Sequence, residues 1–573
     1  MKRILEMTLV CILCLSMLLI FATCTSASSS QQPMLEWDRT FGGVSDDVAW
    51  SVVQTNDGGY AIAGWTASLG AENEDFWLVK INSTGGIEWN QTYGGPYWER
   101  AYCLIQTKDG GFAIAGETRP YSTSYCNRDF LLVKTDANGS MRWSRTYGGS
   151  NQEEAYSVIQ TRDNGYAIAG RTISFGAGGS EDMWLVKTDA DGNLEWSHPY
   201  GGTGIEIAYS VIQADDGGYA IGGETGSRSE ERDMLLVKTD PTGNVQWQSA
   251  YGRAGSICEF ATSLIQTTDG GYAMAGFREF VGADSDFYLV KTDKDGAAQW
   301  DKTYGGPTRE LALDAFQTSD GGYMLAGGTN WLSSPDLWLV KTDSVGNEEW
   351  NQTYGGAGSE WAYSVIQTTD GGYAIAGCTT SFGAGNYDFW LMKLAPRARL
   401  VDFFLHGCAS LDNNSPTALT AKYKDSPSIK FSGGNPWKEI GIWTAPASLT
   451  DGRLEALCGV DVWLGLKNSD DQGTNFDLRV EVYKDGVLVA SGETYLIKGV
   501  TRNPEKAMKA TVSFGSFSPV DFDGINDTLS LKIFTRIGTD GNGNFGGGHS
   551  SAVGLRLYFD AVSRPTMLAA SIA

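Results

Sequence analysis

Hydrophobic and polar positions repeat along most of this chain with a period of 50 to 54 residues. Seven copies lie between Trp37 and Lys393, and each follows roughly W-x-x-T-Y-G-G, then A-x-S-V-I-Q-T-x-D-G-G-Y-A-I-A-G-x-T, then D-F-W-L-V-K-T-D-x-x-G-N. A repeat of this length is typical of a solenoid or a propeller, in which each unit packs against its neighbours. Residues present in every copy are therefore expected to build the unit, and function is expected where the copies differ.

Within one copy the pattern predicts four short antiparallel strands. In the second copy, residues 102–107 and 112–118 flank a tight turn, and the alternating segment 129–134 leads through another turn to a strand around Trp143. The Asp-Gly and Asn-Gly pairs in these turns supply the positive φ angles that hairpins need. Four short strands per period indicate the blade of a β-propeller.

The number of copies predicts how the ring closes. The seventh W-L-M-K strand ends at Lys393 with no tryptophan-bearing strand after it, whereas an orphan strand of that kind, residues 35–40, precedes the first copy. We expect the N-terminal strand to complete the last blade, because this leaves no blade edge unpaired. The prediction is an all-β fold with a seven-bladed β-propeller over residues 34–395.

One segment of the unit resembles a known family. Asp136, Gly139 and Trp143 fit the pattern D-x-x-G-x-x-x-W, which is similar to the tryptophan-docking motif of quinoprotein-like propellers. The unit also resembles the D-G-G-Y repeats of secreted archaeal and bacterial surface proteins. The resemblance implies the propeller fold and says little about activity. A quinone-dependent enzyme of that superfamily commonly has an adjacent cysteine pair and eight blades, whereas this chain has no Cys-Cys and seven copies.

The repeat stops near residue 395, and a different pattern follows. Segments 476–483, 528–534 and 553–559 alternate between apolar and polar residues and are separated by polar loops. Residues 400–566 are long enough for one further β-domain, and we expect a β-sandwich of the jelly-roll type.

The N-terminus and the charge predict the compartment. Residues 1–27 have the basic start, apolar run and small-residue cleavage site of a signal peptide, with lipid attachment at Cys24 as an alternative. No other segment is apolar for long enough to span a bilayer. The net charge of −25 argues against a nucleic-acid partner. We expect a secreted or cell-surface protein whose partner is an extracellular carbohydrate or a surface protein.

Aromatic residues that differ between the copies are the candidate ligand-binding residues. They lie in the loops between the second and third strands or near the start of a unit, which share one face of such a propeller. Aromatic rings on a rigid platform stack on sugars or anchor protein partners. The alternative is that some of the rings fold back over the blade core. The candidates are Tyr97, Trp98, Tyr121, Tyr125, Trp331 and Trp361.

Three polar positions occur in almost every copy: the Gln of V-I-Q-T, an Asp before the third strand and an acid after G-G. They could form a ring that holds a cation. Repetition in nearly every copy instead favours a role in satisfying backbone groups, since a single active site needs one copy only.

Calcium is the one metal that the sequence suggests, and it would be structural. Two loops of the C-terminal region place oxygen ligands at alternate positions, although plain turns have the same composition. The candidate ligands are Asp521, Asp523, Asn526, Asp540, Asn542 and Asn544. No cofactor is indicated.

Signatures of catalysis are scarce. The three histidines form no ligand pair or triad pattern, and G-x-S-x-G and phosphate-loop motifs are absent from the sequence. The sequence therefore favours a non-enzymatic binding or adhesion protein. The alternatives are a secreted enzyme of polysaccharide-degrading or quinoprotein type and a structural component of the cell envelope.

Overall fold

The computed structural model describes residues 33–572 except 71–72, 120–126, 177–179, 227–231, 254–255, 281–283, 331–332, 397–398, 406–410, 413–423, 426–428, 432–434, 446–451, 467–473, 502–505, 516, 523–525, 539–552 and 560–566. All regular structure in these residues is β-strand apart from a single 3₁₀ position, which confirms the predicted all-β class. Contacts divide the chain into two compact units, one ending at Pro396 and the other beginning at Arg397. No helix in the described residues could cross a membrane.

The repeat region consists of 28 strands in sets of four, which we call units 1 to 7. Unit 1 comprises β2 (Asp47–Gln54), β3 (Tyr60–Thr66), β4 (Asp75–Ile81) and β5 (Ile87–Tyr93), and unit 2 comprises β6 (Trp98–Gln106), β7 (Phe112–Arg119), β8 (Asp129–Thr135) and β9 (Met141–Tyr147). Unit 3 comprises β10 (Glu153–Gln160), β11 (Tyr166–Thr172), β12 (Asp182–Thr188) and β13 (Leu194–Tyr200), and unit 4 comprises β14 (Ile205–Gln213), β15 (Tyr219–Gly226), β16 (Arg232–Thr239) and β17 (Val245–Tyr251). Unit 5 comprises β18 (Ser256–Gln266), β19 (Tyr272–Phe280), β20 (Ser285–Thr292) and β21 (Ala298–Tyr304), and unit 6 comprises β22 (Leu311–Gln317), β23 (Tyr323–Thr329), β24 (Asp336–Thr342) and β25 (Glu348–Tyr354). Unit 7 comprises β26 (Glu360–Gln367), β27 (Tyr373–Thr379), β28 (Asp388–Leu394) and β1 (Leu35–Phe41).

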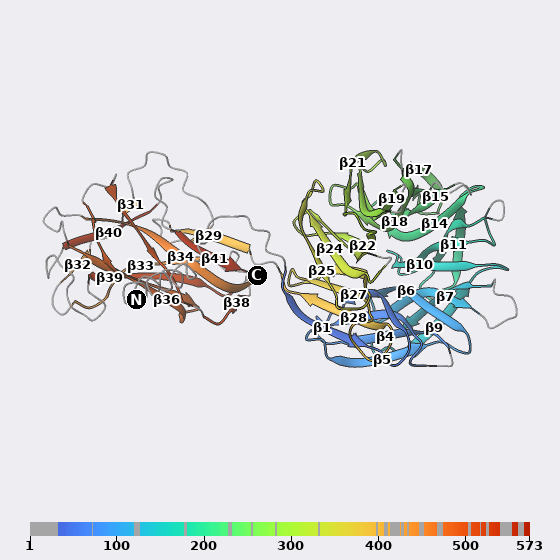
Figure 1. The fold of residues 1–573 in the computed structure, drawn as a ribbon, viewed down its shortest axis with the longest axis horizontal. Helices are drawn as coiled ribbons and strands as arrows, with labels where there is room; N and C mark the ends of the chain where they lie inside the picture. The colour runs from blue at the N-terminus through green and yellow to red at the C-terminus, as the bar shows by residue number, and fades with distance from the viewer. Residues whose placement is uncertain are drawn as a thin grey trace, which may run out of the picture. The chain divides into compact units, whose positions relative to one another are not determined.

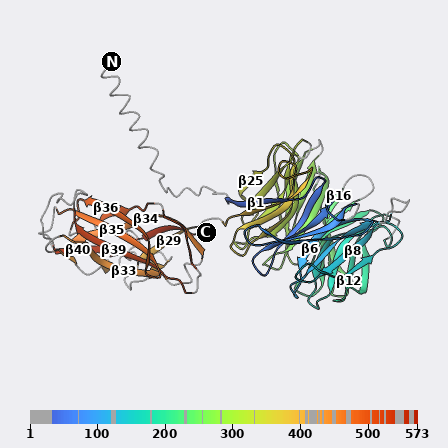
Figure 2. The ribbon, with the colours of Figure 1, turned by 90° about the horizontal axis from the view of Figure 1, so that it is seen from below.

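Each unit is an antiparallel sheet of the β-propeller type, and the units are arranged around a central axis (Figure 1). Unit 7 takes its outer strand from the N-terminus, because β1 pairs antiparallel with β28, with Phe41 opposite Phe389. Figures 1 and 2 show the blue strand β1 beside the yellow strands of that unit. Units 4 and 5 are also joined by one parallel bridge between Arg232 and Cys258.

Hydrophobic packing holds neighbouring units together. Seven clusters of buried side chains each combine two adjacent units, and the cluster between units 7 and 1 contains Phe389 and Trp77, whose ring centroids are 4.5 Å apart. A fully buried side chain of this size contributes about 1.5–3 kcal/mol by leaving water. The A-I-A-G strand supplies small residues to these junctions, so that the large rings of the next unit can approach.

The repeated glutamine also connects the units, as the structural interpretation of the sequence predicts. The side-chain oxygen of Gln160 accepts a hydrogen bond from the Lys108 amide of the preceding unit at 2.9 Å. The contact between Gln54 and the Thr369 amide, at 2.8 Å, joins unit 1 to unit 7 in the same way. Backbone donors at the turns are thereby satisfied across each of these junctions.

The tryptophan and glycine of the D-x-x-G-x-x-x-W motif form a second connection. Trp89 of unit 1 packs edge-on against Phe112 of unit 2, and a Cβ added to Gly139 would lie 2.5 Å from the Trp89 ring. Gly139 also has a φ of 78°, which favours glycine. Its carbonyl accepts a hydrogen bond from the Tyr93 hydroxyl at 2.6 Å. The residues shared by all copies therefore build the ring.

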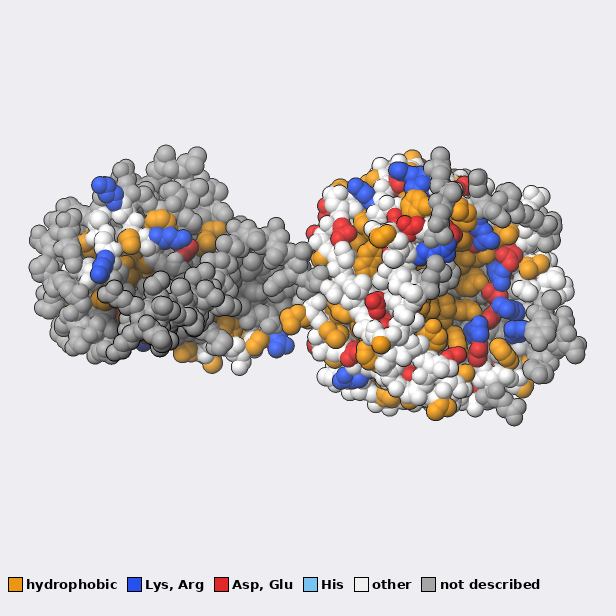
Figure 3. Space-filling view, in the orientation of Figure 1, with side chains coloured by type: hydrophobic (Ala, Val, Ile, Leu, Met, Phe, Trp, Pro, Cys, Tyr) orange, Lys and Arg blue, Asp and Glu red, His pale blue; other side chains and the backbone are white. Residues whose placement is uncertain are grey.

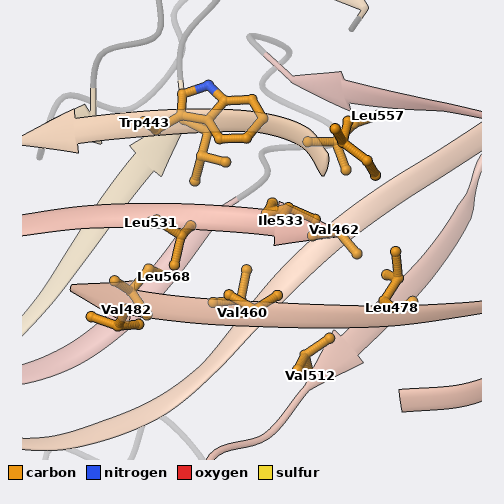
Figure 4. Packing of buried hydrophobic residues seen from close by; sticks show 14 of the residues in the cluster. Trp443, Val460, Val462, Leu478, Val482, Val512, Leu531, Ile533, Leu557 and Leu568 are labelled. Atoms are coloured by element: carbon orange, nitrogen blue, oxygen red, sulfur yellow. The ribbon is translucent and has the colours of Figure 1, made fainter. Parts of the chain in front are cut away.

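The C-terminal unit contains two sheets. The larger sheet comprises β29 (Arg399–Leu405), β30 (Leu411–Asp412), β31 (Lys424–Asp425), β32 (Ile429–Lys430), β34 (Gly452–Leu466), β37 (Met508–Val512), β38 (Val520–Phe522), β40 (Val553–Phe559) and β41 (Met567–Ile572). The smaller sheet comprises β33 (Lys438–Ala445), β39 (Leu529–Ile537), β35 (Phe476–Lys484) and β36 (Val487–Ile497). Both sheets contribute to one hydrophobic cluster, in which Val460 and Val462 of the larger sheet lie near Leu531 and Ile533 of the smaller one (Figure 4).

Candidate functional site

Three rows of side chains differ from unit to unit and surround one end of the central channel. The first row follows the Ala-Gly pair of the second strand, which is Gly-Gly in unit 4, and the other two rows flank the alanine that is shared by all the first strands. The first row is Trp65, Glu117, Arg171, Glu224, Phe277, Gly328 and Cys378. The row before the alanine is Val48, Arg100, Glu154, Ile207, Phe260, Leu311 and Trp361. The row after it is Trp50, Tyr102, Tyr156, Tyr209, Thr262, Leu313 and Tyr363.

A β-bulge places the last of these rows against the channel. In every first strand the pairing register shifts on either side of this residue, for example between Ala49 and Ser51 around Trp50. A bulge turns the extra side chain away from the regular alternation of the strand. Aromatic residues occupy the row in five units and form a continuous series of contacts. The ring centroid of Trp50 lies 4.2 Å from that of Tyr363 and 5.1 Å from that of Tyr102.

Units 6, 7 and 1 form the apolar side of the channel mouth, together with neighbouring residues of unit 2. Here a pocket of about 530 Å³ opens, and a hydrophobic cluster separate from the junctions between units lines it. Figure 3 shows hydrophobic side chains in the hollow at the centre of the repeat region. The lining residues are Asp46, Val48, Trp50, Trp65, Arg100, Tyr102, Leu311, Leu313, Trp361, Tyr363, Cys378 and Tyr387. A pocket of this size and composition is typical of ligand sites.

The pocket lining has two charged side chains, of which one is ion-paired and the other is not. The Arg100 guanidinium is held by Glu74 through two hydrogen bonds and lies over the Trp65 ring, 5.0 Å from its centroid. Asp46 accepts one hydrogen bond, from the Tyr387 amide at 3.4 Å, and makes no ion pair with the described residues. Burial raises the pKa of the Cys378 thiol well above its usual range, so this thiol is neutral and unreactive.

Units 2 to 4 form the opposite, ion-paired side. Glu154 accepts hydrogen bonds from Arg171 at 2.7 and 3.1 Å and from Arg128, and Arg128 also contacts Glu117 at 3.1 Å. In unit 4, Arg232 contacts Glu224 at 2.8 Å. Burial opposes ionisation of Glu154, but the hydrogen bonds and charge of Arg171 hold its pKa below the usual value. Figure 3 shows acidic and basic side chains alternating at this side of the hollow.

Deeper in the channel, a row of small polar residues links the inner strands. The Ser51 hydroxyl accepts a hydrogen bond from the Leu104 amide at 3.1 Å, and equivalent residues act similarly in other units. Unit 6 has Asp314 at this position, which accepts hydrogen bonds from Ser263 at 3.0 Å and from the Val365 amide at 2.9 Å. Burial raises the pKa of Asp314 to about 6.

The repeated acids pair near the Y-G-G turn. Between units 1 and 2, a Cβ on Gly94 would overlap Asp75 and would lie 2.8 Å from Glu99, so the glycine makes room for two carboxylates. Glu99 also accepts a hydrogen bond from the Thr118 hydroxyl at 3.0 Å. These acids therefore fix the turn, as the structural interpretation expects.

The junction of units 5 and 6 has a third acid, Asp284, so that carboxylate oxygens of Asp284, Asp286 and Glu310 lie within 4.8 Å of one another. Burial and the two neighbouring charges raise the pKa of Asp286 to about 6.

The aromatic residues predicted from the sequence do not all lie together. Tyr97 and Trp98 are 43% and 36% exposed on unit 2, where the Arg119 guanidinium lies over the Trp98 ring. Trp361 is 8% exposed and lines the pocket. Tyr121, Tyr125 and Trp331 lie outside the described residues.

The predicted calcium ligands are described only in part. Asp521 belongs to β38, where its carboxylate lies 3.8 Å from Arg453, and Asn526 follows in the next loop. Asp523, Asp540, Asn542 and Asn544 lie outside the described residues, and calcium binding stays a prediction.

Sequence reasoning missed most of the pocket, because it looked for variation in the loops. Trp50, Trp65 and Tyr363 lie within strands that look uniform when each copy is examined alone. Aligning the seven copies column by column would have shown that the residues beside A-G and beside the shared alanine vary, while their neighbours do not.

Comparisons with known proteins give little support beyond the structure itself. No protein family and no curated protein matches the chain. Solved structures with some similarity include the Neurospora crassa Pan2 WD40 domain, with 12% identity over 60% of this chain and 88% of that one and a TM-score of 0.38. Another is Chaetomium thermophilum Sqt1 bound to the N-terminus of ribosomal protein L10, with 10% identity over 64% and 100% and a TM-score of 0.38. A protein of unknown function from Dyadobacter fermentans has 12% identity over 51% and 93% and a TM-score of 0.35. Similarities this weak support no conclusion about this chain.

Proposed function

We propose that this chain is a secreted or cell-surface binding protein without catalytic activity, which recognises an extracellular carbohydrate or protein partner. In this proposal the repeat region is a seven-bladed β-propeller closed by β1, and the C-terminal unit is a β-sandwich of the jelly-roll type. The partner inserts a group into the pocket at the channel mouth.

The observation that carries the proposal is the composition of this pocket. Nine of its twelve lining side chains are aromatic or aliphatic, and burial keeps its thiol neutral by raising the thiol pKa. Such a lining binds a ligand by excluding water and stacking on it. Glycoside hydrolysis would instead need two carboxyl groups facing the substrate, about 5–10 Å apart. Asp46 is the one acid among the described residues of the lining, which favours binding over hydrolysis.

Two other functions remain as alternatives. A secreted enzyme of polysaccharide-degrading or quinoprotein type would turn over a polymer or take up a redox cofactor. A structural component of the cell envelope would bind further copies of itself. The experiment below distinguishes all three.

The test is a binding screen of the whole chain against polysaccharides and envelope proteins, with reducing-sugar release measured in the same samples. Three forms are compared: the native chain, Trp50→Ala in the pocket and Trp98→Ala on the exposed surface of unit 2. We expect saturable binding without product, and a loss of about tenfold or more in Trp50→Ala, since aromatic anchors contribute about 2 kcal/mol or more. Thermal unfolding of each variant shows whether it still folds.

The other outcomes contradict parts of the proposal. Product release would show an enzyme. Loss of binding in Trp98→Ala alone would move the site from the pocket to the outer surface. Concentration-dependent self-association without other binding would favour the structural role.

A further inference from the structure

The charge in the pocket indicates what kind of group it accepts, and this inference rests on the proposed function. Arg100 is engaged by Glu74 through both Nε and Nη2, so its charge is already balanced. Asp46 has no cationic partner among the described residues. The pocket therefore has an excess negative charge beside aromatic walls, which disfavours an anionic ligand.

The aromatic walls suit a cation. The faces of Trp, Tyr and Phe rings attract ammonium and guanidinium groups electrostatically. The pocket lining already contains one such contact, because the Arg100 guanidinium lies over the Trp65 ring, and the exposed surface of unit 2 contains another, between Arg119 and Trp98. The net charge of −25 on the chain adds a long-range attraction for cations.

The pocket is less suited to a neutral sugar. A sugar ring needs several hydrogen-bonding groups around its hydroxyls. The polar groups of this lining are Asp46, Arg100, three tyrosine hydroxyls, three indole N–H groups and a thiol. Among these, Arg100 is engaged by Glu74, and the Trp50 indole nitrogen is buried and has no hydrogen-bond partner among the described residues. An apolar group with one positive charge uses the lining more completely than a polyhydroxylated ligand does.

We propose that the pocket lined by Asp46, Trp50, Trp65, Trp361, Tyr363 and Tyr387 binds an alkylammonium group, such as a lysine side chain of a protein partner. Asp46 balances the positive charge, and the aromatic and aliphatic walls cover the apolar part of the ligand. The pocket volume of about 530 Å³ is ample for a lysine side chain or a quaternary ammonium compound.

The test measures binding of small probes to the whole chain by calorimetry. Choline is compared with 3,3-dimethyl-1-butanol, which has the same shape without the charge, and N-acetyl-lysine amide represents the protein source. We expect choline and N-acetyl-lysine amide to bind about tenfold or more tightly than the neutral probe, because a desolvated cation–π contact and one balanced charge exceed 1.4 kcal/mol together. Asp46→Asn should remove this preference, while Asp191→Asn, the same change on an exposed turn of unit 3, should keep it.

Three results would overturn the inference. Equal affinities for choline and the neutral probe would show an apolar pocket without cation selectivity. A preference that persists in Asp46→Asn would place the cation elsewhere. Failure of both cationic probes to bind would exclude an alkylammonium ligand, and the loss or retention of partner binding in Trp50→Ala would still decide the proposed function separately. Choline binding without N-acetyl-lysine amide binding would support the ligand class and identify a free quaternary ammonium compound as its source.

Discussion

The two sides of the channel mouth are built from the same repeat and yet have opposite chemistry. On the side of units 2 to 4, the variable rows contain Glu117, Glu154 and Arg171. Arg171 forms an ion pair with Glu154, and Glu117 forms one with Arg128, which precedes β8. On the side of units 6, 7 and 1, the same rows contain residues such as Trp361 and Cys378, and the space between them forms the pocket. The repeat fixes the backbone, so side-chain replacement in three columns is enough to create a site.

On the ion-paired side, arginine and glutamate side chains occupy the space that stays open as the pocket on the apolar side. Arg171 contacts both Glu154 and Glu181, and Arg128 contacts Glu117 and Glu154, so each of these charges has an oppositely charged neighbour. A pocket open to a ligand requires groups that are not already satisfied in this way. We therefore expect the apolar side to determine which ligand binds, and the ion-paired side to stabilise the fold.

The largest expected effect is on the ion-paired side. Glu154→Gln leaves Arg128 and Arg171 without the carboxylate that they share, and breaking a buried ion pair costs about 3–5 kcal/mol. Chemical unfolding of the repeat region should show this loss in the free energy of unfolding. The control is Asp295→Asn, which removes an exposed ion pair with Lys294 and should cost less than about 1 kcal/mol. Equal losses in the two variants would contradict the buried network.

A smaller effect is expected on the apolar side. Gly328 packs against Trp361, and a Cβ there would lie 2.6 Å from the indole ring. Gly328→Ala should displace the ring into the pocket, cost about 1–3 kcal/mol by overpacking and weaken ligand binding. Gly306→Ala is the matched control, because no atom lies within 4 Å of the added methyl group. If Gly328→Ala unfolds and binds like the native chain, Trp361 does not depend on that space.

The two sides also differ in how far the sequence predicts them. The four strands of a unit and the turns between them could be predicted, because alternation and Asp-Gly pairs are local signals that seven copies reinforce. The structural role of Gln54 and its equivalents followed from their repetition. The pocket could not be predicted in the same way: a bulge determines that Trp50 faces the channel, and Asp46 and Leu313 meet only because the ring closes. Trp98 looked as suitable as Trp361 in the sequence, since exposure depends on the neighbouring unit.

The smallest effect concerns the response of stability to pH, for which the two sides have opposite signs. Asp314, below the apolar side, has its pKa raised by burial from 3.8 to about 6, so the native chain binds this proton more tightly than the unfolded chain does. Its contribution is complete below pH 3.8 and is lost as the pH rises through about 6. Glu154, whose pKa lies below the usual value despite its burial because of Arg171, contributes above the unfolded-state pKa and loses this contribution as the pH falls.

Asp314→Asn isolates the first of these contributions. The native chain should lose about 1–2 kcal/mol between pH 4 and pH 6.5 that the variant does not lose, because the amide keeps polar contacts with Ser263 and the Val365 amide without titrating. The measurement is the unfolding free energy of the native chain minus that of Asp314→Asn at each pH. The contributions of other titrating groups such as Asp286 are the same in both chains and cancel in this difference. A difference that is constant with pH would mean that folding leaves the pKa of Asp314 at its unfolded value, so that the group is largely ionised above pH 4.5. In that case the channel below the pocket would contain a second negative charge, and binding of cationic probes should then be as strong at pH 4.5 as at pH 7.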